Sequence, residues 1–305
     1  MTLPPRAVLV HRRTELDELI ARHGTRQQAA FFLASRDRCI DEVEARDLAQ
    51  RAAATMASGA IPADWRRGQV ERSDLSRFLF GPEDVIVAVG QDGLVANVAK
   101  YLSGQLVIGV NPEPDRNSGV LVVHPPQATA DLLAVATSTA TGHHGAAATD
   151  AVQARVMVEA VVDDGQVLRA LNEVYLGHPT HQSARYRIET AGGRHERHSS
   201  SGVLVGTGTG ATGWCRSVWR ERRSQLRLPE PEETRLAWFA REAWPSPATG
   251  TDHTEGVVDD EEELVVTAES DLVIFGDGIE GDALHLTWGQ RARLRVASQR
   301  LHLLA

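Results

Sequence analysis

The stretch Asp84–Val110, which reads DVIVAVGQDGLVANVAKYLSGQLVIGV, decides the fold class of this chain. It opens with a continuous apolar run, Val85–Val89, as expected of a strand that is buried on both faces. The turn Gly90-Gln91-Asp92-Gly93 follows, then a helical stretch over Leu94–Leu102 and a second apolar run over Leu106–Val110. Strand, turn, helix and strand in this order predict a βαβ unit, and such units build parallel sheets with right-handed crossovers.

The chain on either side of this unit changes character near residue 125. Before it, Ala7–His11 predicts a short buried strand, and Glu15 to about Met56 is helical in character. After it, Gln127–Thr139 predicts a helix, and Thr137–Asp150, rich in Ala, Thr and Gly, predicts a mobile loop. Short segments rich in β-branched residues then dominate: Val156–Val162, Val167–Leu176, Tyr186–Thr190, Gly202–Gly206, Glu263–Ala268, Leu272–Phe275, Ala283–Trp288 and Arg291–Ala297. We therefore predict an N-terminal α/β domain with a parallel sheet over residues 1–125 and a C-terminal all-β domain over residues 126–296.

Composition narrows the class of protein. The chain has 305 residues, of which 42% are hydrophobic and 24% charged, as in globular proteins large enough to bury a core without disulfides or metals. The net charge of −9 argues against a nucleic-acid-binding surface. No apolar run approaches the ~20 residues of a membrane span, and the first residues lack the apolar stretch of a signal peptide. Cys39 and Cys215 are too few for a disulfide framework, so we expect a cytoplasmic protein without nucleic-acid or membrane partners.

The first candidate site is the turn Gly90-Gln91-Asp92-Gly93. A carboxylate follows a buried strand at the start of a helix, and the flanking glycines let a ligand approach the backbone closely. Helix N-termini bind phosphate through their free N–H groups. The turn by itself leaves two interpretations open, a phosphate-binding turn or an Asp92 that only caps its helix.

The second candidate is the pair Asn172-Glu173 within the apolar stretch Ala170–Val174. Neighbouring side chains of a strand point to opposite faces, so one of the two should point inward, where a polar group needs partners. The alternative is an edge position that faces water.

The third candidate is the stretch Val203–Trp214, which reads VLVGTGTGATGW. Gly208, Gly210 and Gly213 satisfy the spacing G-x-G-x-x-G, but the surroundings are all-β, which disfavours a dinucleotide fingerprint of the βαβ type. We expect instead a Gly/Thr loop that offers N–H and hydroxyl donors to a ligand, followed by a helix over Thr212–Glu221.

Other patterns indicate no chemistry. Three pairs of histidines lack the companion ligands of a metal motif, so we predict no protein metal site: His143/His144, His178/His181 and His195/His198. The chain has no Walker A motif and no G-x-S-x-G elbow. The acidic run Asp259–Glu263 is typical of a solvated turn.

Taken together and in this order, the three candidates resemble the motifs of the NAD kinase family. The family has a Gly-Gly-Asp-Gly turn, an Asn-Glu or Asn-Asp pair and a Thr-Pro-Thr-Gly-Ser-Thr-Ala-Tyr loop, which match Gly90–Gly93, Asn172-Glu173 and Thr207–Trp214. Val107–Asn111 also matches the family's strand after the first motif. The likeness is closer to the divergent mitochondrial-type branch, whose segments resemble Asn111–Gly119, Ala170–Val174 and Ser200–Trp214. The resemblance is firm between Val85 and Trp214.

Two departures from the family pattern bear on activity. Gln91 replaces the second glycine of the turn; if that position has a positive φ, Gln costs about 1 kcal/mol or more and crowds the phosphate side. In the loop, Gly208 and Ala211 replace Pro and Ser, and Ala211 lacks a hydroxyl that could contact a ligand.

The resemblance implies an α/β domain, a C-terminal β-sandwich with an active site in the cleft between them, and a return of the tail, about 297–305, to the first domain. It implies transfer of the ATP γ-phosphoryl group to the adenosine 2′-hydroxyl of NAD or NADH, with Mg²⁺ carried by ATP. Asp92 would be the catalytic proton acceptor. The other implied binding residues are Gly90, Gln91, Gly93, Asn111, Asn172, Glu173, Thr207, Thr209, Gly210, Thr212 and Trp214.

Some choices stay open at this level. A nucleotide-binding protein without kinase activity is supported by Gln91 and Ala211, and a related kinase could use another acceptor, such as a lipid or another nucleoside. ATP and inorganic polyphosphate are both possible donors. We also expect a homo-oligomer, either a dimer or a tetramer.

Overall fold

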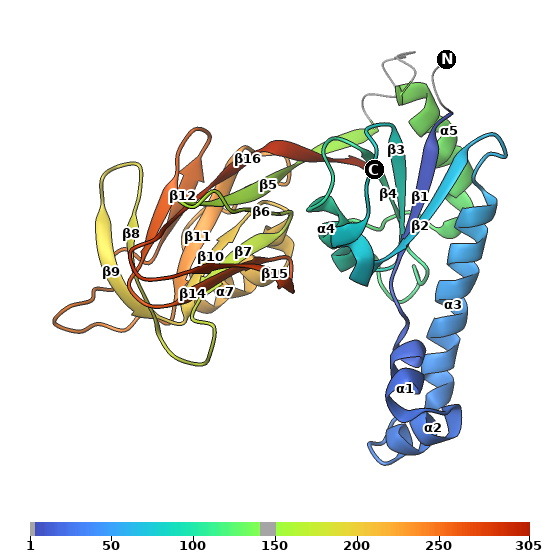
Figure 1. Cartoon of the computed structure of the whole chain (residues 1–305), viewed down its shortest axis with the longest axis horizontal. Helices are drawn as coiled ribbons and strands as arrows, with labels where there is room; N and C mark the ends of the chain where they lie inside the picture. Colours follow the sequence, from blue (N-terminus) through green and yellow to red (C-terminus); the bar gives the residue numbers. More distant parts are fainter. Residues whose placement is uncertain (1–3, 141–150) are drawn as a thin grey trace. The chain divides into compact units, whose positions relative to one another are not determined.

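The computed structural model describes residues 4–140 and 151–305, which form two compact units (Figure 1). Unit 1 consists of Met1–Gln153 and His302–Ala305, and unit 2 consists of Ala154–Leu301. The division falls after residue 153 rather than after residue 125, because helix α5 (Thr129–Ala140) packs on the first sheet, with Leu133 in its core. Residues 137–140 end this helix, and the rest of the expected loop, 141–150, lies outside the described residues.

Unit 1 is built on a parallel sheet. Its strands are β1 (Arg6–His11), β2 (Arg66–Glu71), β3 (Asp84–Val89), β4 (Leu106–Val110) and the end of β16 (Arg291–Leu304). They follow the spatial order β2-β1-β3-β4-β16, and every neighbouring pair is parallel. From β16, only His302–Leu304 take part, paired with Leu106–Ile108. Every residue of β3 is buried, as the continuous apolar run predicts.

Helices cover the two faces of this sheet (Figure 1). The segment expected to be helical from Glu15 to Met56 forms three helices, α1 (Glu15–His23), α2 (Arg26–Ala34) and α3 (Ile40–Gly59). Gly24 ends α1 with φ 83°, a conformation that favours glycine. Ala53 and Ala57 of α3 share one core with α5, whereas α4 (Asp92–Ala99) packs on the other face. Short 3₁₀ turns, η1 (Arg72–Arg77) and η2 (Pro126–Ala128), complete the connections.

The order of the strands creates a reversal point between β1 and β3. From β1 the chain crosses to β2 on one side, and from β2 it returns to β3 on the other side of β1. The connections that leave the carboxyl ends of β1 and β3 therefore diverge. In parallel α/β sheets such a reversal point opens a crevice, and ligands bind there.

Unit 2 contains two antiparallel sheets. One is formed by β5 (Val152–Val162), β6 (Val167–Ala170), β8 (Ala184–Glu189), β9 (His195–Ser200), β13 (Leu264–Ala268) and the first part of β16. The other is formed by β7 (Glu173–Gly177), β10 (Gly202–Gly206), β11 (Arg235–Arg241), β12 (Glu255–Asp259), β14 (Leu272–Gly276) and β15 (Ile279–Leu286). One cluster of buried side chains combines residues of both sheets, among them Tyr186 and Trp238.

A helix covers the outer face of the second sheet. Val203 and Val205 of β10 face the core between the sheets, and Leu204 faces outward, as the period of two requires. Leu204 packs with Cys215 and Val218 of α7 (Trp214–Arg222), which follows the short turn η3 (Gly210–Thr212). The helix predicted over Thr212–Glu221 is thus present with slightly different bounds.

The division into an N-terminal α/β region with a largely parallel sheet and a C-terminal region of antiparallel sheets is confirmed. Among the helices of residues 4–140 and 151–305, none combines the length and the apolar character needed to cross a membrane.

Candidate functional site

The turn after β3 begins α4 without backbone strain. Gln91 is the N-cap residue, with φ −102° and ψ 165°, and Asp92 is the first residue of the helix. This extended conformation is open to any residue. The strain expected for Gln at this position is therefore absent, and so is the simple alternative in which Asp92 is the helix cap. The Gln91 side chain is exposed.

The Asp92 carboxylate is held by the backbone of a neighbouring loop. Its Oδ1 accepts hydrogen bonds from the N–H groups of Val120, Leu121 and Val122, at 3.0, 2.7 and 3.0 Å. Its Oδ2 accepts one, from Val120 at 3.0 Å. Oδ1 is thus occupied by protein donors, and Oδ2 keeps room to accept another hydrogen bond.

Two glycines allow this loop to come so close. A Cβ at Gly109 of β4 would lie 1.9 Å from the carbonyl oxygen of Leu121, so the loop passes over a position where any side chain would collide. Gly119 has φ 67°, which favours glycine. Gly109 in the segment Val107–Asn111 therefore lets the backbone at Leu121 pass directly over β4, next to Asp92.

Asn111 shapes the same loop from within. Its side chain is 2% exposed; Nδ2 donates to the carbonyl of Asn117 at 2.6 Å, and Oδ1 accepts from the N–H of Glu113 at 3.0 Å. The structure thus places the Asn111 amide inside the loop, where both of its ends have protein partners.

In unit 2, the pair Asn172-Glu173 lies at a break between two strands. The stretch expected to be one strand, Val167–Leu176, divides into β6 and β7 because the Asp277 carboxylate accepts the N–H groups of Leu171 and Asn172, both at 2.7 Å. Glu173 is partly buried. Burial, and secondarily the negative charge of Asp277, raise the pKa of Glu173 to about 8, so at pH 7 its carboxyl group is mostly protonated.

The Gly/Thr loop is tied to this break. Asn172 O accepts the N–H of Thr207 at 2.9 Å, and the Thr207 hydroxyl donates to Leu171 O at 2.6 Å. The same hydroxyl accepts the N–H groups of Thr209 and Gly210. The Thr207 side chain therefore organises the loop.

Two glycines of this loop are required by packing. A Cβ at Gly208 would lie 2.0 Å from the backbone of Glu230, and one at Gly210 would lie 2.1 Å from Asn172 O. The spacing G-x-G-x-x-G thus reflects close backbone contacts within an all-β unit.

The three threonines of the loop differ in what their hydroxyl groups contact. Thr212 donates to Thr209 O at 2.8 Å. Thr209 is 1% exposed, and its buried Oγ1 has no hydrogen-bond partner among the described residues. A buried hydroxyl group without a hydrogen-bond partner lowers the stability of the folded chain. Of the three threonines, Thr209 is therefore the one whose hydroxyl group is left to bind a further group.

The aromatic ring at the end of the loop has partners within unit 2. Trp214 stacks on Tyr175, with 5.4 Å between ring centroids, and the Arg241 guanidinium lies 5.3 Å from the Trp214 ring centroid. Ala211, the second departure from the family pattern, is 7% exposed.

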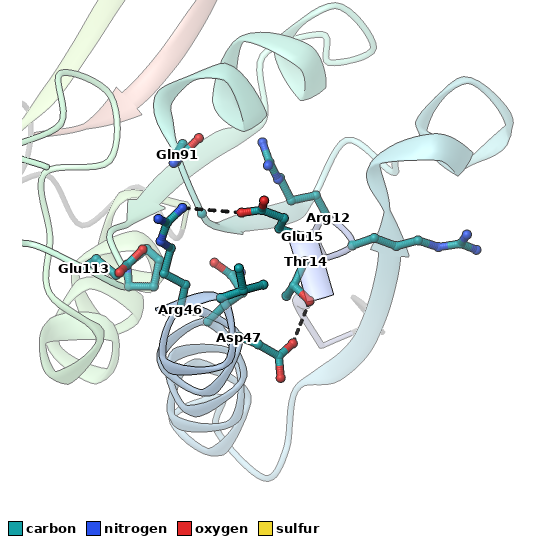
Figure 2. Close-up of a pocket in the computed structure, with 12 residues that line it drawn as sticks. Arg12, Thr14, Glu15, Arg46, Asp47, Gln91 and Glu113 are labelled. Atoms are coloured by element: carbon teal, nitrogen blue, oxygen red, sulfur yellow. Dashed lines mark hydrogen bonds and ion pairs between the residues drawn. The ribbon is translucent and has the colours of Figure 1, made fainter. Parts of the chain in front are cut away.

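A pocket lies at the reversal point of the sheet in unit 1 (Figure 2). It is lined by residues that follow β1, β3 and β4 and by one side of α3: Arg12, Arg13, Thr14, Glu15, Val43, Arg46, Asp47, Gln50, Gly90, Gln91, Pro112 and Glu113. Of the residues predicted from the sequence, it contains Gly90 and Gln91. Two hydrogen bonds fix its walls, from the Thr14 hydroxyl to Asp47 at 2.6 Å and from the Gln50 amide to Val89 O at 2.8 Å.

The arginines of this pocket were not predicted as site residues. Arg12 and Arg13 follow β1 directly, just as the glycine turn follows β3. Because the carboxyl ends of parallel strands lie at one edge of a sheet, the position of these arginines after a predicted strand was a signal that could have found them. Arg46 lies on a helix with no sequence signal of its own.

Metal ligands do not gather in the described part of the chain. Within residues 4–140 and 151–305, no group of three His, Cys, Asp or Glu side chains is placed to hold a metal ion. His198 Nε2 instead contacts a Glu196 carboxylate oxygen at 2.7 Å, and the Thr180 N–H donates to His178 Nδ1. His143 and His144 lie outside the described residues.

Comparison with known proteins adds no family assignment. No protein-family model matches this chain, and no curated protein matches its sequence. Functional inference therefore starts from the residues and the geometry of each unit.

Proposed function

We propose that this protein is a kinase of the NAD kinase type, which transfers the γ-phosphoryl group of ATP to the adenosine 2′-hydroxyl of NAD or NADH and so makes NADP or NADPH. The observation that carries the proposal is the Asp92 carboxylate, fixed by three backbone N–H groups at the turn after β3, with Oδ2 open to a further hydrogen bond. The resemblance of the turn, the Asn-Glu pair and the Gly/Thr loop to the family supports it.

Phosphoryl transfer to a hydroxyl group needs positioning, a proton acceptor and neutralisation of charge more than covalent chemistry. In this proposal Asp92 Oδ2 accepts the proton of the attacking hydroxyl. The hydrogen bonds to Oδ1 keep the carboxylate from rotating, so it does not have to be reoriented during the reaction. Gly93 lies exposed beside it, and a Cβ there would contact nothing within 4 Å, so the glycine leaves open space for a ligand.

Unit 2 carries groups suited to a nucleoside. Glu173, protonated at neutral pH, can donate a hydrogen bond to a hydroxyl oxygen or a ring nitrogen, and Asn172 offers both a donor and an acceptor. The buried Thr209 hydroxyl is a further candidate donor. In the proposal these groups recognise the dinucleotide.

Mg²⁺ belongs to the proposal as the companion of ATP. Carried by the phosphates of the nucleotide and by water, Mg²⁺ would supply positive charge beside the transferred group. Mg²⁺ bound in this way requires no dedicated cluster of protein ligands.

The test is an assay of the purified chain with ATP, Mg²⁺ and either NAD or NADH, with NADP or NADPH as the product measured. Asp92→Asn keeps the shape of the side chain and removes the proton acceptor, so kcat should fall by about 10²–10⁴-fold while NAD binding is largely kept. Asp131→Asn is the matched control, because Asp131 is an exposed aspartate in the first turn of another helix, α5, and it should leave the rate unchanged.

Two outcomes favour the alternatives. If the wild-type protein binds NAD but forms no NADP, a nucleotide-binding role without catalysis leads. If ADP accumulates only when another alcohol is supplied, the chain is a kinase with a different acceptor. An Asp92→Asn variant with more than half of the wild-type activity would remove Asp92 from the reaction.

A further inference from the structure

Strand β2 forms one edge of the parallel sheet of unit 1 (Figure 1). It pairs with β1 along its whole length, Arg66–Glu71, in a register without a bulge, and with no other strand of the described residues. An edge strand exposes a row of backbone N–H and C=O groups that can pair with another chain. Natural proteins protect such edges with proline, bulges, covering loops or charged side chains, and of these β2 has only its charged side chains.

The edge strand β9 in unit 2 shows how this chain covers an edge elsewhere. The Trp244 N–H donates to Ser199 O at 2.8 Å, and the Gly250 N–H donates to Arg197 O at 3.0 Å, so the segment 244–250 lies along β9. From residues 4–140 and 151–305, no backbone group forms such a hydrogen bond to the outer edge of β2. The edge of β2 is therefore open to a partner.

The alternation of the backbone determines which residues of β2 face this open edge. The Arg66 N–H donates to Pro5 O at 2.9 Å, so the backbone groups of Arg66 face β1. In a parallel pair, every second residue of a strand faces the neighbouring strand in this way. The odd-numbered residues of β2 therefore point their N–H and C=O groups outward: Arg67, Gln69 and Glu71.

This edge is complementary to itself. If a second copy of β2 lies antiparallel on a two-fold axis at Gln69, Arg67 of each copy lies opposite Glu71 of the other. Each outward residue then exchanges two N–H···O=C hydrogen bonds with the residue opposite. Opposite charges on facing residues of an antiparallel pair stabilise it, and a two-fold arrangement closes at two copies.

The charges select this register over the neighbouring ones. A two-fold axis at Arg67 or at Glu71 places two like charges opposite each other, which is unfavourable. An axis at Gly68 or at Val70 separates the arginine from the glutamate and leaves an outward residue of each copy beyond the paired segment. Only the axis at Gln69 uses all the outward residues and matches their charges.

The two charged side chains keep capacity for a partner. Arg67 is exposed, and of its five N–H donors the structure gives one an acceptor, Ile61 O at 2.8 Å. Glu71 pairs with Arg13 at 3.2 Å and accepts the Ser73 hydroxyl at 3.1 Å, and a carboxylate has further lone pairs for another donor.

An exposed apolar side chain belongs to the same region. Phe78 packs on the edge strand, since a Cβ at Gly68 would lie 3.6 Å from its ring. The next residue, Leu79, is 87% exposed. Burial of this side chain against a second copy would add to the stability of the assembly.

We propose that β2 pairs with β2 of a second copy of this chain, antiparallel and on a two-fold axis at Gln69, so that the two parallel sheets join into one. The partner is a second copy because the charges of this edge match those of the same edge turned around. The proposal concerns assembly and does not depend on the proposed kinase activity.

Charge reversal tests the register. The mass of the full chain in solution is measured by light scattering and sedimentation over a range of concentrations. Arg67→Glu and Glu71→Arg each place like charges opposite each other twice in the dimer, so each should weaken association about tenfold or more. The variant that carries both substitutions restores the opposite charges and should associate like wild type. Arg22→Glu, a reversal at an exposed arginine of α1, is the control that should leave association unchanged.

Two further variants test the strand pairing itself. Gln69→Pro removes an N–H that points away from β1, and proline is tolerated at such edge positions, so the chain should fold and be monomeric. In a Cys39→Ser background, Gln69→Cys should form a disulfide between copies under mild oxidation, because opposed Cα atoms lie about 5.5 Å apart. Arg67→Cys in the same background should not, because its two copies would lie about 13 Å apart.

The outcomes are decisive in both directions. A wild-type chain that stays monomeric, or an association that survives Gln69→Pro and both single charge reversals, would overturn the proposal. A larger wild-type assembly whose mass falls by half in the single charge variants supports β2 pairing as one of its interfaces. Thermal unfolding of each variant controls for loss of structure, and if Gln69→Pro does not fold, the charge variants and the cross-link decide.

Discussion

Glu173 makes the stability of this protein depend on pH in an unusual range. Its pKa rises from an ordinary 4.5 to about 8 because of burial and, to a lesser extent, Asp277. Between these two values the unfolded chain is ionised at this position while the folded chain holds the proton, so the contribution of Glu173 to stability falls as pH rises from 4.5 toward 8. Above about pH 8 the loss is complete.

Glu173→Gln should remove this dependence. Gln mimics the protonated carboxyl group, so the variant should gain stability relative to wild type at pH 8.5 and gain less at pH 5. Urea unfolding at the two pH values measures this, with the exposed Glu280→Gln as the control that should show no difference. If the free energies of unfolding of wild type and Glu173→Gln differed by the same amount at both pH values, the elevated pKa of Glu173 would be contradicted.

A substitution at Gln91 distinguishes two hypotheses, an active kinase and a nucleotide-binding protein of the same fold without kinase activity. Because its φ is −102°, replacement by Gly relieves no strain. If Gln91 donates to a donor phosphate, Gln91→Gly should keep the rate level or lower it by up to about 1.5 kcal/mol in transition-state free energy, about tenfold. If instead Gln91 blocks the space of the γ-phosphate, NADP formation should appear only in the variant. An inactive pair that still binds NAD would eliminate the steric explanation.

At the scale of elements, the loop from Asn111 to His124 and helix α4 stabilise each other. Asp92→Ala would leave the N–H groups of Val120, Leu121 and Val122 without their acceptor, at a cost of about 1–3 kcal/mol in the free energy of unfolding. Hydrogen exchange of these three amides should accelerate, whereas Asp131→Ala should leave it unchanged. Protection equal to wild type in Asp92→Ala would show that the loop holds its shape without the carboxylate.

The sequence predicted the elements whose signals are local and missed those that depend on distant residues. The sequence predicted the strands β3 and β4 and the glycine turn after β3. Each of these features follows from residues that are adjacent in the sequence, a continuous apolar run or a group of glycines. The break between β6 and β7 was missed because the carboxylate that causes it, Asp277, lies about a hundred residues further along the chain.

The residues of the candidate site also fall into those that the sequence predicted and those that it missed. Gly90 and Gln91 were found from the turn, whereas Arg46 was missed because only the packing of α3 brings it to the pocket. Thr209 and Thr207 were chosen together, yet the structure gives them different tasks: one hydroxyl organises the loop and the other lacks a partner. Neighbouring threonines of one motif cannot be told apart before their contacts are known.

At the scale of the whole molecule, the last residues complete the first unit. His302–Leu304 pair with β4, His124 Nε2 donates to Leu304 O at 3.0 Å, and Leu304 is 1% exposed. Leu304→Ala should therefore destabilise unit 1 by about 2–5 kcal/mol, the usual cost of truncating a buried leucine. Hydrogen exchange of Leu106–Ile108 should speed up, while Ala305→Gly, which trims an exposed side chain and keeps the hydrogen bond from the Ala305 N–H to Ala151 O, should have a small effect. Unchanged exchange in β4 would mean that the tail does not support it.

The return of β16 to unit 1 also orders events during biosynthesis. Residues 154–301 form unit 2 as an insertion within unit 1, whose last strand segment comes from 302–304. Domains usually fold as they emerge from the ribosome, the N-terminal one first. Here the sheet of unit 1 cannot be finished until residues 302–304 have been translated, so unit 2 has all of its residues before unit 1 does. A chain that ends before residue 302 would therefore carry a sheet, made first, whose strand β4 still has an unpaired edge.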